Sequence, residues 1–248
     1  MHKAEQDYPV TKESVYDLNV SGGACEILKN GEAVHSSDDL SKAVFNLQWL
    51  MHREALAGIT DRIRIHAGCA EWEGKRFLVV GDKGAGKTTL MITLLLAGFR
   101  VVGDELVLVR DGKAMPFPRR FNIKEESTRL LTQLNPFFEK LPYNMTYYNH
   151  RMYSLSPHDI GREWKIDEAD VRAVFYLVPN HDGETRIEEC PKYLMVNRVM
   201  PMSFLSENDD HMKISHLCRM IDNAECYTIY IGGLEGAVSG LQERLSVI

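Results

Sequence analysis

Residues 77–88 read Phe-Leu-Val-Val-Gly-Asp-Lys-Gly-Ala-Gly-Lys-Thr, and they decide the fold expected for this chain. The apolar run at residues 77–80 is typical of a buried central strand. Residues 81–88 match the pattern G-x-x-x-x-G-K-[ST], and the almost entirely apolar residues 88–97 predict a helix that is covered on more than one side. This strand–loop–helix order predicts a phosphate-binding loop, because the loop N–H groups and the helix N-terminus then point at an anion.

The loop positions have expected roles in binding a nucleoside triphosphate. Lys87 should reach the β- and γ-phosphates, and the hydroxyl of Thr88 should bind Mg²⁺. Thr89 is either a further polar contact or a packing residue. The expected cofactors are therefore ATP and Mg²⁺. The expected nucleotide-binding residues are Gly81, Asp82, Lys83, Gly84, Ala85, Gly86, Lys87, Thr88 and Thr89.

An acidic pair, Asp104-Glu105, follows a second apolar segment and lies 17 residues beyond Lys87. An isolated Asp-Glu pair is usually a solvated turn. Beside a phosphate-binding loop, one carboxylate can bind the metal while the other accepts the proton of an attacking hydroxyl. The sequence therefore predicts metal ligation by Thr88, Asp104 and Glu105.

Two further polar positions have both a catalytic and an ordinary interpretation. His66 lies 15 residues before Gly81, and a lone histidine on a strand is more often a core or surface residue. Arg119 and Arg120 follow a proline and could direct a guanidinium at the transferring phosphate, or could form a surface pair.

In combination these segments resemble the HPr kinase/phosphorylase family, and most closely its smaller relatives, which include kinases of lasso-peptide precursors. The resemblance rests on His66-Ala67-Gly68, on the loop, and on Arg100-Val101-Val102-Gly103-Asp104-Glu105, in that order and spacing. It implies an α/β fold with a P-loop core like that of phosphoenolpyruvate carboxykinase. It also implies Asp104 as the base for a serine hydroxyl, assisted by His66, with Glu105 helping to bind Mg²⁺. Lys87 and Arg119 complete the expected catalytic set.

The remaining pattern predicts an α/β chain with a mixed central sheet and flanking helices. We expect one kinase-like domain over residues 1–248, in which residues 1–60 form a short strand-and-helix layer and residues 61–248 the core. Residues 63–69 are predicted as one strand and residues 127–140 as one helix. Residues 141–164 lack periodicity and are interpreted as a functional loop, a lid or a disordered segment. Their tyrosines either close over a substrate, form a partner surface or pack within the loop; they are Tyr143, Tyr147, Tyr148 and Tyr153.

Composition excludes several classes of protein. The 248 residues carry 29 Lys+Arg and 35 Asp+Glu, a formal net charge of −6, and 44% are apolar, which excludes collagen-like, coiled-coil and wholly disordered chains. The acidic balance argues against a nucleic-acid partner. No apolar run is long enough for a membrane span, so we expect a cytoplasmic protein without a membrane partner. Five scattered cysteines without a C-x-x-C pair argue against a structural zinc site.

Together these patterns predict a Mg²⁺- and ATP-dependent phosphotransferase, an HPr-kinase-like serine kinase. The expected acceptor is a serine or threonine of a protein or peptide. One alternative is a small-molecule kinase that acts on an amino acid or polyol, and another is a non-catalytic nucleotide-binding regulator. Each of these interpretations is compatible with a homo-oligomer.

Overall fold

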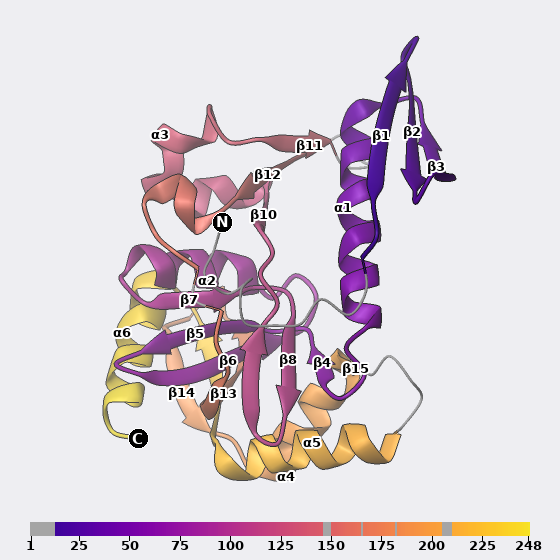
Figure 1. Ribbon diagram of the computed structural model, residues 1–248. Helices are drawn as coiled ribbons and strands as arrows, with labels where there is room; N and C mark the ends of the chain where they lie inside the picture. Colours follow the sequence, from indigo (N-terminus) through magenta and orange to yellow (C-terminus); the bar gives the residue numbers. More distant parts are fainter. Residues whose placement is uncertain (1–12, 146–149, 165, 182, 205–209) are drawn as a thin grey trace. The chain divides into compact units, whose positions relative to one another are not determined.

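The computed structural model describes residues 13–145, 150–164, 166–181, 183–204 and 210–248 (Figure 1). Its contacts divide the chain into two compact units, one of Met1–Ile59 with Tyr143–Arg151 and one of Thr60–Pro142 with Met152–Ile248. The expectation of a single domain stays a prediction. No helix in the described ranges is long and apolar enough to cross a membrane.

The first unit contains an antiparallel sheet in the order β1-β2-β3 and a long helix. The helix begins after Asp39, whose carboxylate accepts a hydrogen bond of 2.9 Å from the N–H of Lys42, and it ends at Gly58. A side-chain acceptor at this position satisfies a backbone N–H that has no partner inside the helix. The elements of this unit are β1 (Tyr16–Ser21), β2 (Ala24–Lys29), β3 (Glu32–Ser37), α1 (Leu40–Ala57) and β11 (Tyr143–Met145).

The second unit is built on a ten-stranded mixed sheet in the described residues, flanked by helices, so the expected α/β class with a mixed central sheet is confirmed. Its sheet strands are β4 (Ile63–Ile65), β5 (Gly68–Trp72), β6 (Lys75–Gly81), β7 (Arg100–Gly103), β8 (Val107–Arg110), β9 (Lys113–Pro116), β13 (Ala169–Pro179), β14 (Arg186–Glu189), β15 (Ser203–Phe204) and β16 (Glu225–Ile231). Its longer helices are α2 (Lys87–Leu96), α4 (Lys192–Val199), α5 (Asp210–Asn223) and α6 (Leu234–Ser246).

Strand β13 is the centre of this sheet. It runs parallel to β6 on one side and to β16 on the other, so that Val174 lies opposite both Leu78 and Cys226. Its first residues also pair with β9 in the antiparallel direction. A strand with neighbours on both sides and helices on both faces is buried on both faces, which accounts for the apolar runs in the middle of β6 and β13.

The two faces of β6 contact different helices (Figure 1). Phe77 and Val79 belong to the core that contains the apolar residues of α2 and α6. Leu78 and Val80 alternate with them and belong to the core that contains those of α4 and α5. This period of two is dictated by the strand itself, and it places the end of β6 between two helix layers.

Two expected elements are wrong in detail. Residues 63–69 form two strands, because the chain passes from β4, which pairs with β8, to β5, which pairs with β6. His66 lies at this crossing, where its N–H donates to the carbonyl of Met202. The helix expected at residues 127–140 is instead broken into η2 (Glu125–Leu130), η3 (Thr132–Leu134) and α3 (Asn135–Phe138). Pro136 lacks an N–H and so cannot continue a helix that begins before it.

The segment expected to be irregular also contains ordered elements, β12 (Arg151–Leu155) and η4 (Pro157–Ile160). Strand β12 pairs with β10 (Phe121–Lys124), with Leu155 opposite Phe121. Tyr153 is buried, and its ring lies 5.1 Å from that of Phe138, so this tyrosine packs in the core. Tyr147 and Tyr148 lie outside the described residues.

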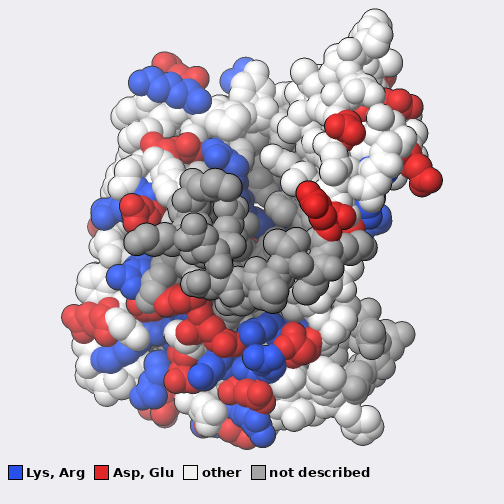
Figure 2. Space-filling model, viewed as in Figure 1, with Lys and Arg blue, Asp and Glu red and all other residues white. Residues whose placement is uncertain are grey.

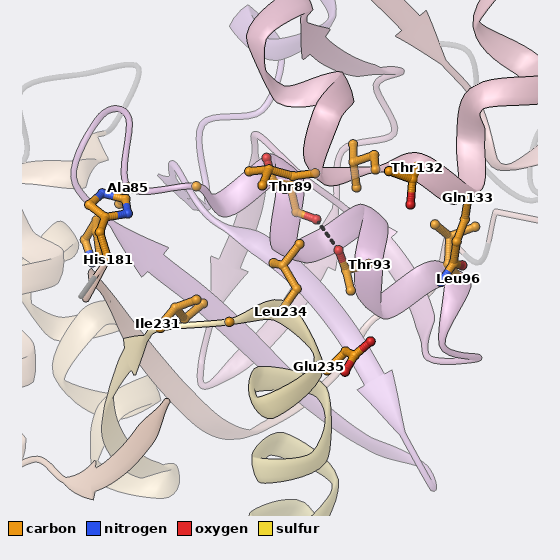
Figure 3. Close-up of a pocket in the computed structure, with 16 residues that line it drawn as sticks. Ala85, Thr89, Thr93, Leu96, Thr132, Gln133, His181, Ile231, Leu234 and Glu235 are labelled. Atoms are coloured by element: carbon orange, nitrogen blue, oxygen red, sulfur yellow. Dashed lines mark hydrogen bonds between the residues drawn. The ribbon is translucent and has the colours of Figure 1, made fainter. Parts of the chain in front are cut away.

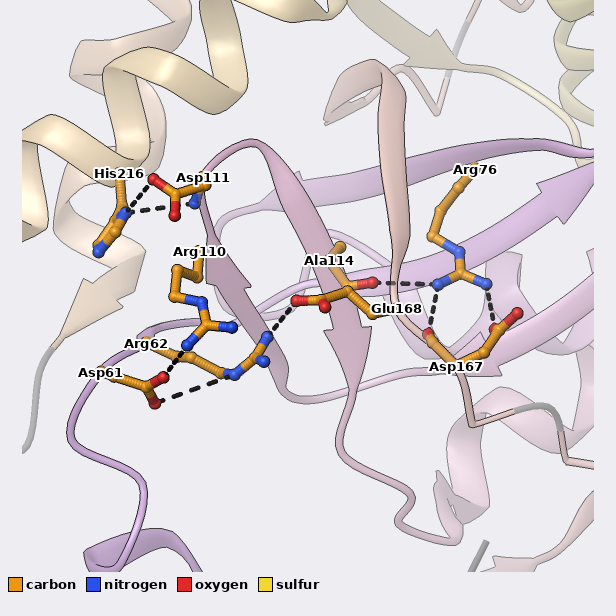
Figure 4. A network of polar contacts seen from close by, with 9 residues as sticks. All are labelled: Asp61, Arg62, Arg76, Arg110, Asp111, Ala114, Asp167, Glu168 and His216. Atoms are coloured by element: carbon orange, nitrogen blue, oxygen red, sulfur yellow. Dashed lines mark hydrogen bonds and ion pairs between the residues drawn. The ribbon is translucent and has the colours of Figure 1, made fainter. Parts of the chain in front are cut away.

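A polar network around Arg76 joins neighbouring strands of the sheet (Figure 4). Arg76 lies at the start of β6, whereas the glycine-rich loop follows the end of this strand. Arg76 is fully buried, and its guanidinium donates to the carbonyls of Ala114 and Asp167 at 3.0 and 2.6 Å. It also pairs with the carboxylates of Glu71 and Asp167 at 3.1 and 2.6 Å.

On the face of the molecule in Figure 2, the described acidic and basic side chains are interspersed rather than separated into patches of one sign.

Candidate functional site

The glycine-rich loop (residues 81–88) connects the end of β6 to the start of α2. Gly81 packs directly against β13, since a Cβ at this position would lie 2.9 Å from the carbonyl oxygen of Leu177. Gly86 caps α2 with a φ of 97°, a left-handed conformation that side chains disfavour. The first N–H groups of α2 consequently face the loop without a side-chain cap. Backbone N–H groups without partners at a helix N-terminus can bind an anion.

Lys87 is the only cation buried at the start of α2 in the described structure. Its side chain is 7% exposed, and its ammonium donates to the carbonyls of Gly81 and Asp82 at 2.7 and 3.2 Å. Burial lowers the pKa of Lys87, and the nearby carboxylate of Asp104 opposes that change most strongly. The ammonium is therefore held against the loop, next to the N-terminus of the helix.

Asp104 is 3% exposed, and neither of its carboxylate oxygens has a hydrogen-bond partner among the described residues. Burial raises the pKa of this carboxyl group to about 7, and the charge of Glu105 adds to the rise. The Thr88 hydroxyl and the charge of Lys87 lower the pKa of Asp104. The hydroxyl lies near the carboxylate but outside full hydrogen-bond geometry. Buried polar atoms are normally paired, so a water, an ion or a ligand is expected to interact with this carboxylate.

Glu105 is held in place by three neighbours. Its carboxylate pairs with the guanidinium of Arg119 at 2.7 Å and accepts a hydrogen bond of 3.5 Å from the Asn122 amide. Its backbone carbonyl lies 2.9 Å from Nδ1 of His66. The side chains of Glu105 and Arg119 remain 28% and 30% exposed, which leaves the pair accessible from solvent.

The contact with Glu105 determines the protonation of the His66 ring. A carbonyl oxygen only accepts, so Nδ1 carries the proton and Nε2 of the neutral ring carries a lone pair. The surrounding protein lowers the pKa of His66 by desolvation, although the residue is partly exposed, and the charge of Lys87 lowers it further. The ring of His66 contacts the backbone of Glu105 rather than the carboxylate of Asp104.

The structure thus brings Lys87, Asp104, Glu105, His66 and Arg119 to one end of the sheet. Thr88 adjoins Asp104, whereas Thr89 is 8% exposed and lines a cavity beside α2. Asp82, Lys83 and Gly84 are exposed on the loop.

Arg120 does not belong to this group, because it binds Ser154 and Asp159. Sequence reasoning missed Asn122, which supports Glu105, and Tyr176, which forms a hydrogen bond with Asp82 that contributes to its raised pKa. Neither has a sequence signal, because each is a single residue outside any recognisable motif.

The oxygens at this end of the sheet suit Mg²⁺. Mg²⁺ keeps several waters and usually takes one or two protein carboxylates together with substrate phosphates. Asp104, Glu105 and the Thr88 hydroxyl provide that donor set, and the unpaired oxygens of Asp104 are the observation that favours it. Clusters of three or more His, Cys, Asp or Glu residues, which would indicate a cage made by protein alone, are absent from the described residues.

A cavity of about 390 Å³ opens beside the loop (Figure 3), and Asp104 is not among its lining residues. It meets the loop at Ala85, Gly86 and Thr89 and extends toward η3 and the start of α6. Its lining residues are Ala85, Gly86, Thr89, Thr93, Leu96, Leu130, Leu131, Thr132, Gln133, Pro179, His181, Ile231, Gly232, Gly233, Leu234 and Glu235.

Comparison with known proteins adds little to this geometry. No family model and no curated protein matches the chain. Among solved structures, the HPr(Ser) kinase/phosphatase from Coxiella burnetii is similar over 74% of this chain and 90% of that chain, with 11% sequence identity and a TM-score of 0.37. A superposition this loose does not establish a shared family, so the family expected from the sequence stays a prediction.

Proposed function

We propose that this protein is a phosphotransferase with a P-loop core of the HPr kinase and phosphoenolpyruvate carboxykinase type. It transfers the γ-phosphoryl group of ATP to the hydroxyl of a serine or threonine in a protein or peptide in the cytoplasm. One observation carries the proposal: a buried Asp104 carboxylate, without a hydrogen-bond partner in the described residues and with a pKa of about 7, beside the phosphate-type loop that holds Lys87.

The loop and Lys87 bind the donor. The N–H groups at the start of α2 face the phosphates, and the Lys87 ammonium leaves the carbonyls of Gly81 and Asp82 to contact the β- and γ-phosphates. Because Lys87 is buried, its charge interacts with the phosphates at a lower effective dielectric than a surface lysine would. In this proposal Thr88 and Glu105 would hold Mg²⁺, which neutralises phosphate charge when it is bound, and Asp104 is left to act as the base.

Asp104 accepts the proton in the transfer step. The acceptor oxygen forms a bond to the γ-phosphorus while its proton moves to the Asp104 carboxylate. The bond between the γ-phosphorus and the bridging oxygen breaks, and ADP leaves with that electron pair. A carboxyl group with a pKa of about 7 is poised for this task near neutral pH, since it is ionised in a large fraction of molecules and still a stronger base than an ordinary aspartate.

Glu105, Arg119 and His66 position this base. The guanidinium of Arg119 and the Nδ1–H of His66 each hold a different part of Glu105, the residue that follows Asp104. Arg119 is also exposed enough to turn from Glu105 toward the transferring phosphate when the donor binds.

The proposal is tested by phosphate transfer from γ-labelled ATP to a library of Ser/Thr peptides and to free hydroxyl compounds. Asp104→Asn should lower transfer by about 10²–10⁴-fold while ATP binding remains within a few-fold of wild type. Lys87→Ala should weaken ATP binding as well. Ser239→Ala, on the exposed face of α6, serves as the control.

Two results would contradict the assignment. Full transfer by Asp104→Asn excludes Asp104 as the base. ATP binding by the wild-type chain without phosphate on any peptide, small hydroxyl compound or protein of a cell extract would favour a nucleotide-binding regulator instead.

A further inference from the structure

Two buried cysteines, Cys190 and Cys226, lie opposite each other where β14 pairs with β16. In this antiparallel pair Glu189 lies opposite Tyr227. The same register, continued by one residue, places Cys190 opposite Cys226, and the N–H of Cys190 donates to the carbonyl of Cys226 at 2.8 Å. Both side chains belong to the core on the α4 and α5 side of the sheet, so both thiols lie on the same face.

This backbone arrangement suits a disulfide. Opposed residues that share hydrogen bonds in an antiparallel pair have Cα atoms about 5.5 Å apart, and disulfides usually join Cα atoms about 4.4–6.8 Å apart. Cys190 follows the last residue of β14, a strand that pairs with β16 alone among the described residues. The backbone at Cys190 is therefore held by a neighbouring strand on one side only and can adjust when the bond closes.

Neither thiol makes a strong hydrogen bond. The thiol of Cys190 donates to the carbonyl of Pro191 at 3.7 Å. The thiol of Cys226 donates to the carbonyl of Ala224, also at 3.7 Å. Because a thiol is a weak donor, turning either side chain toward the other gives up little.

Cys190 has the features of the cysteine that reacts first. The guanidinium of Arg198 donates to its Sγ at 3.6 Å, and reactive cysteines commonly lie beside a cation because it favours the nucleophilic thiolate. Cys190 is 6% exposed and Arg198 is partly exposed, so a small oxidant can reach this sulfur. Burial raises the pKa of Cys226 to about 12, and the neighbouring Cys190 adds to the rise, so Cys226 reacts second and as a thiol.

We propose that Cys190 and Cys226 form a reversible disulfide when the protein meets a peroxide. The sulfur of Cys190 attacks one peroxide oxygen, the O–O bond breaks, and the released hydroxide takes the thiol proton and leaves as water. The sulfur of Cys226 then attacks the sulfenic acid on Cys190. An S–S bond forms, the S–O bond breaks, and the second hydroxide leaves as water with the Cys226 proton. The two thiols lose two electrons, which reduce the peroxide to two waters.

The disulfide is a modification separate from the proposed phosphoryl transfer. Neither cysteine is among the residues assigned to the donor, the metal or the base. Only Pro191 lies between Cys190 and the start of α4, so the bond would tie this helix to β16. In a reducing compartment such bonds are usually transient and redox-sensing, and reduction by a small thiol restores the pair.

The test is peptide mass spectrometry of the wild-type chain after treatment with hydrogen peroxide, with free thiols alkylated before digestion. We expect a linked pair of peptides, one with Cys190 and one with Cys226, that disappears on reduction with dithiothreitol. Cys218→Ala, which removes a more exposed cysteine, should leave this linked pair unchanged. Alkylation of both Cys190 and Cys226 after the treatment, or oxidation confined to Cys218, would overturn the proposal.

Two variants of Arg198 test the order of the steps while keeping both thiols. Arg198→Met removes the cation beside Cys190 and should slow formation of the linked pair at least about fivefold. Arg198→Lys keeps a cation and should form it within about twofold of the wild-type rate. Equal rates in all three chains would overturn the assignment of Cys190 as the cysteine that reacts first.

Discussion

At the scale of single residues, Asp104 is the least ordinary group in the described structure. Its carboxylate is buried without a donor, whereas the buried charges of Arg76 and Lys87 are paired with carboxylates or carbonyls. An unpaired buried carboxylate raises the free energy of the folded state and so lowers stability. A residue that destabilises its own fold in this way is expected where activity requires it.

Replacing Asp104 should therefore stabilise the protein in a pH-dependent manner. Since the pKa of this acid is raised from 3.8 to about 7 in the folded state, the folded chain binds more protons than the unfolded chain between these values. Its contribution to stability is complete below pH 3.8 and is lost as pH rises through about 7. Asp104→Asn removes this loss, so its melting temperature should exceed that of wild type at pH 8 by roughly 2–4 °C or more.

The measurement is thermal unfolding by circular dichroism at pH 8 and at pH 4. No gain is expected at pH 4, where both chains are neutral at this position. Asp82→Asn, an exposed carboxylate of the same loop, should show no comparable gain at pH 8. Equal melting temperatures of wild type and Asp104→Asn at pH 8 would contradict the raised pKa.

At the scale of elements, local pattern predicted most of the strands and helices around the site. The loop, α2 and β6 were predicted together because their residues are contiguous and each has a distinct pattern. The single helix predicted over residues 127–140 was wrong, since Pro136 interrupts the backbone hydrogen bonds and the segment is divided into shorter helices. The change of pairing partner at His66 could not be predicted, because nothing in residues 63–69 specifies which strand lies beside them.

The contact between β6 and β13 leads to a prediction for Gly81. In Gly81→Ala the new Cβ would lie 2.9 Å from the carbonyl oxygen and 3.1 Å from the Cβ of Leu177, a residue that β6 and β16 hold from both sides. Because this backbone cannot move away cheaply, we expect a loss of about 1–3 kcal/mol in the free energy of unfolding. Gly233→Ala, where a Cβ meets nothing within 4 Å, is the matched control.

Urea unfolding followed by fluorescence measures both variants. The result expected is a lower midpoint for Gly81→Ala with an unchanged slope. A midpoint equal to that of Gly233→Ala would show that the two strands are less closely packed at the loop.

At the scale of the second unit, the buried guanidinium of Arg76 links segments that are far apart in the sequence. It joins β6 to Ala114 on β9 and to Asp167 before β13 (Figure 4), and it also binds Glu71 on β5. No local pattern predicts it, since an arginine at the start of a strand is usually exposed.

Arg76→Met should cost about 3–5 kcal/mol of unfolding free energy, because it leaves the largely buried carboxylate of Glu71 without its buried partner. Arg100 pairs with the same carboxylate at 3.0 Å but is 53% exposed, so Arg100→Met should cost less than about 1 kcal/mol. Chemical denaturation of both variants provides the comparison. Equal losses of unfolding free energy in the two variants would show that burial does not determine how much these ion pairs stabilise the protein.

The sequence by itself determined the position of the glycine-rich loop, the strand before it, the helix after it and the acidic pair that follows. Those features depend on residues within a few positions of one another, where spacing and side-chain chemistry suffice. Only the tertiary structure decided that β13, about ninety residues later, lies beside β6, that Asp104 is buried without a partner, and that η3 and the start of α6 enclose a cavity next to the loop. Burial, pKa values and cavities depend on residues that folding brings together from distant parts of the chain. A short segment of sequence therefore does not predict them.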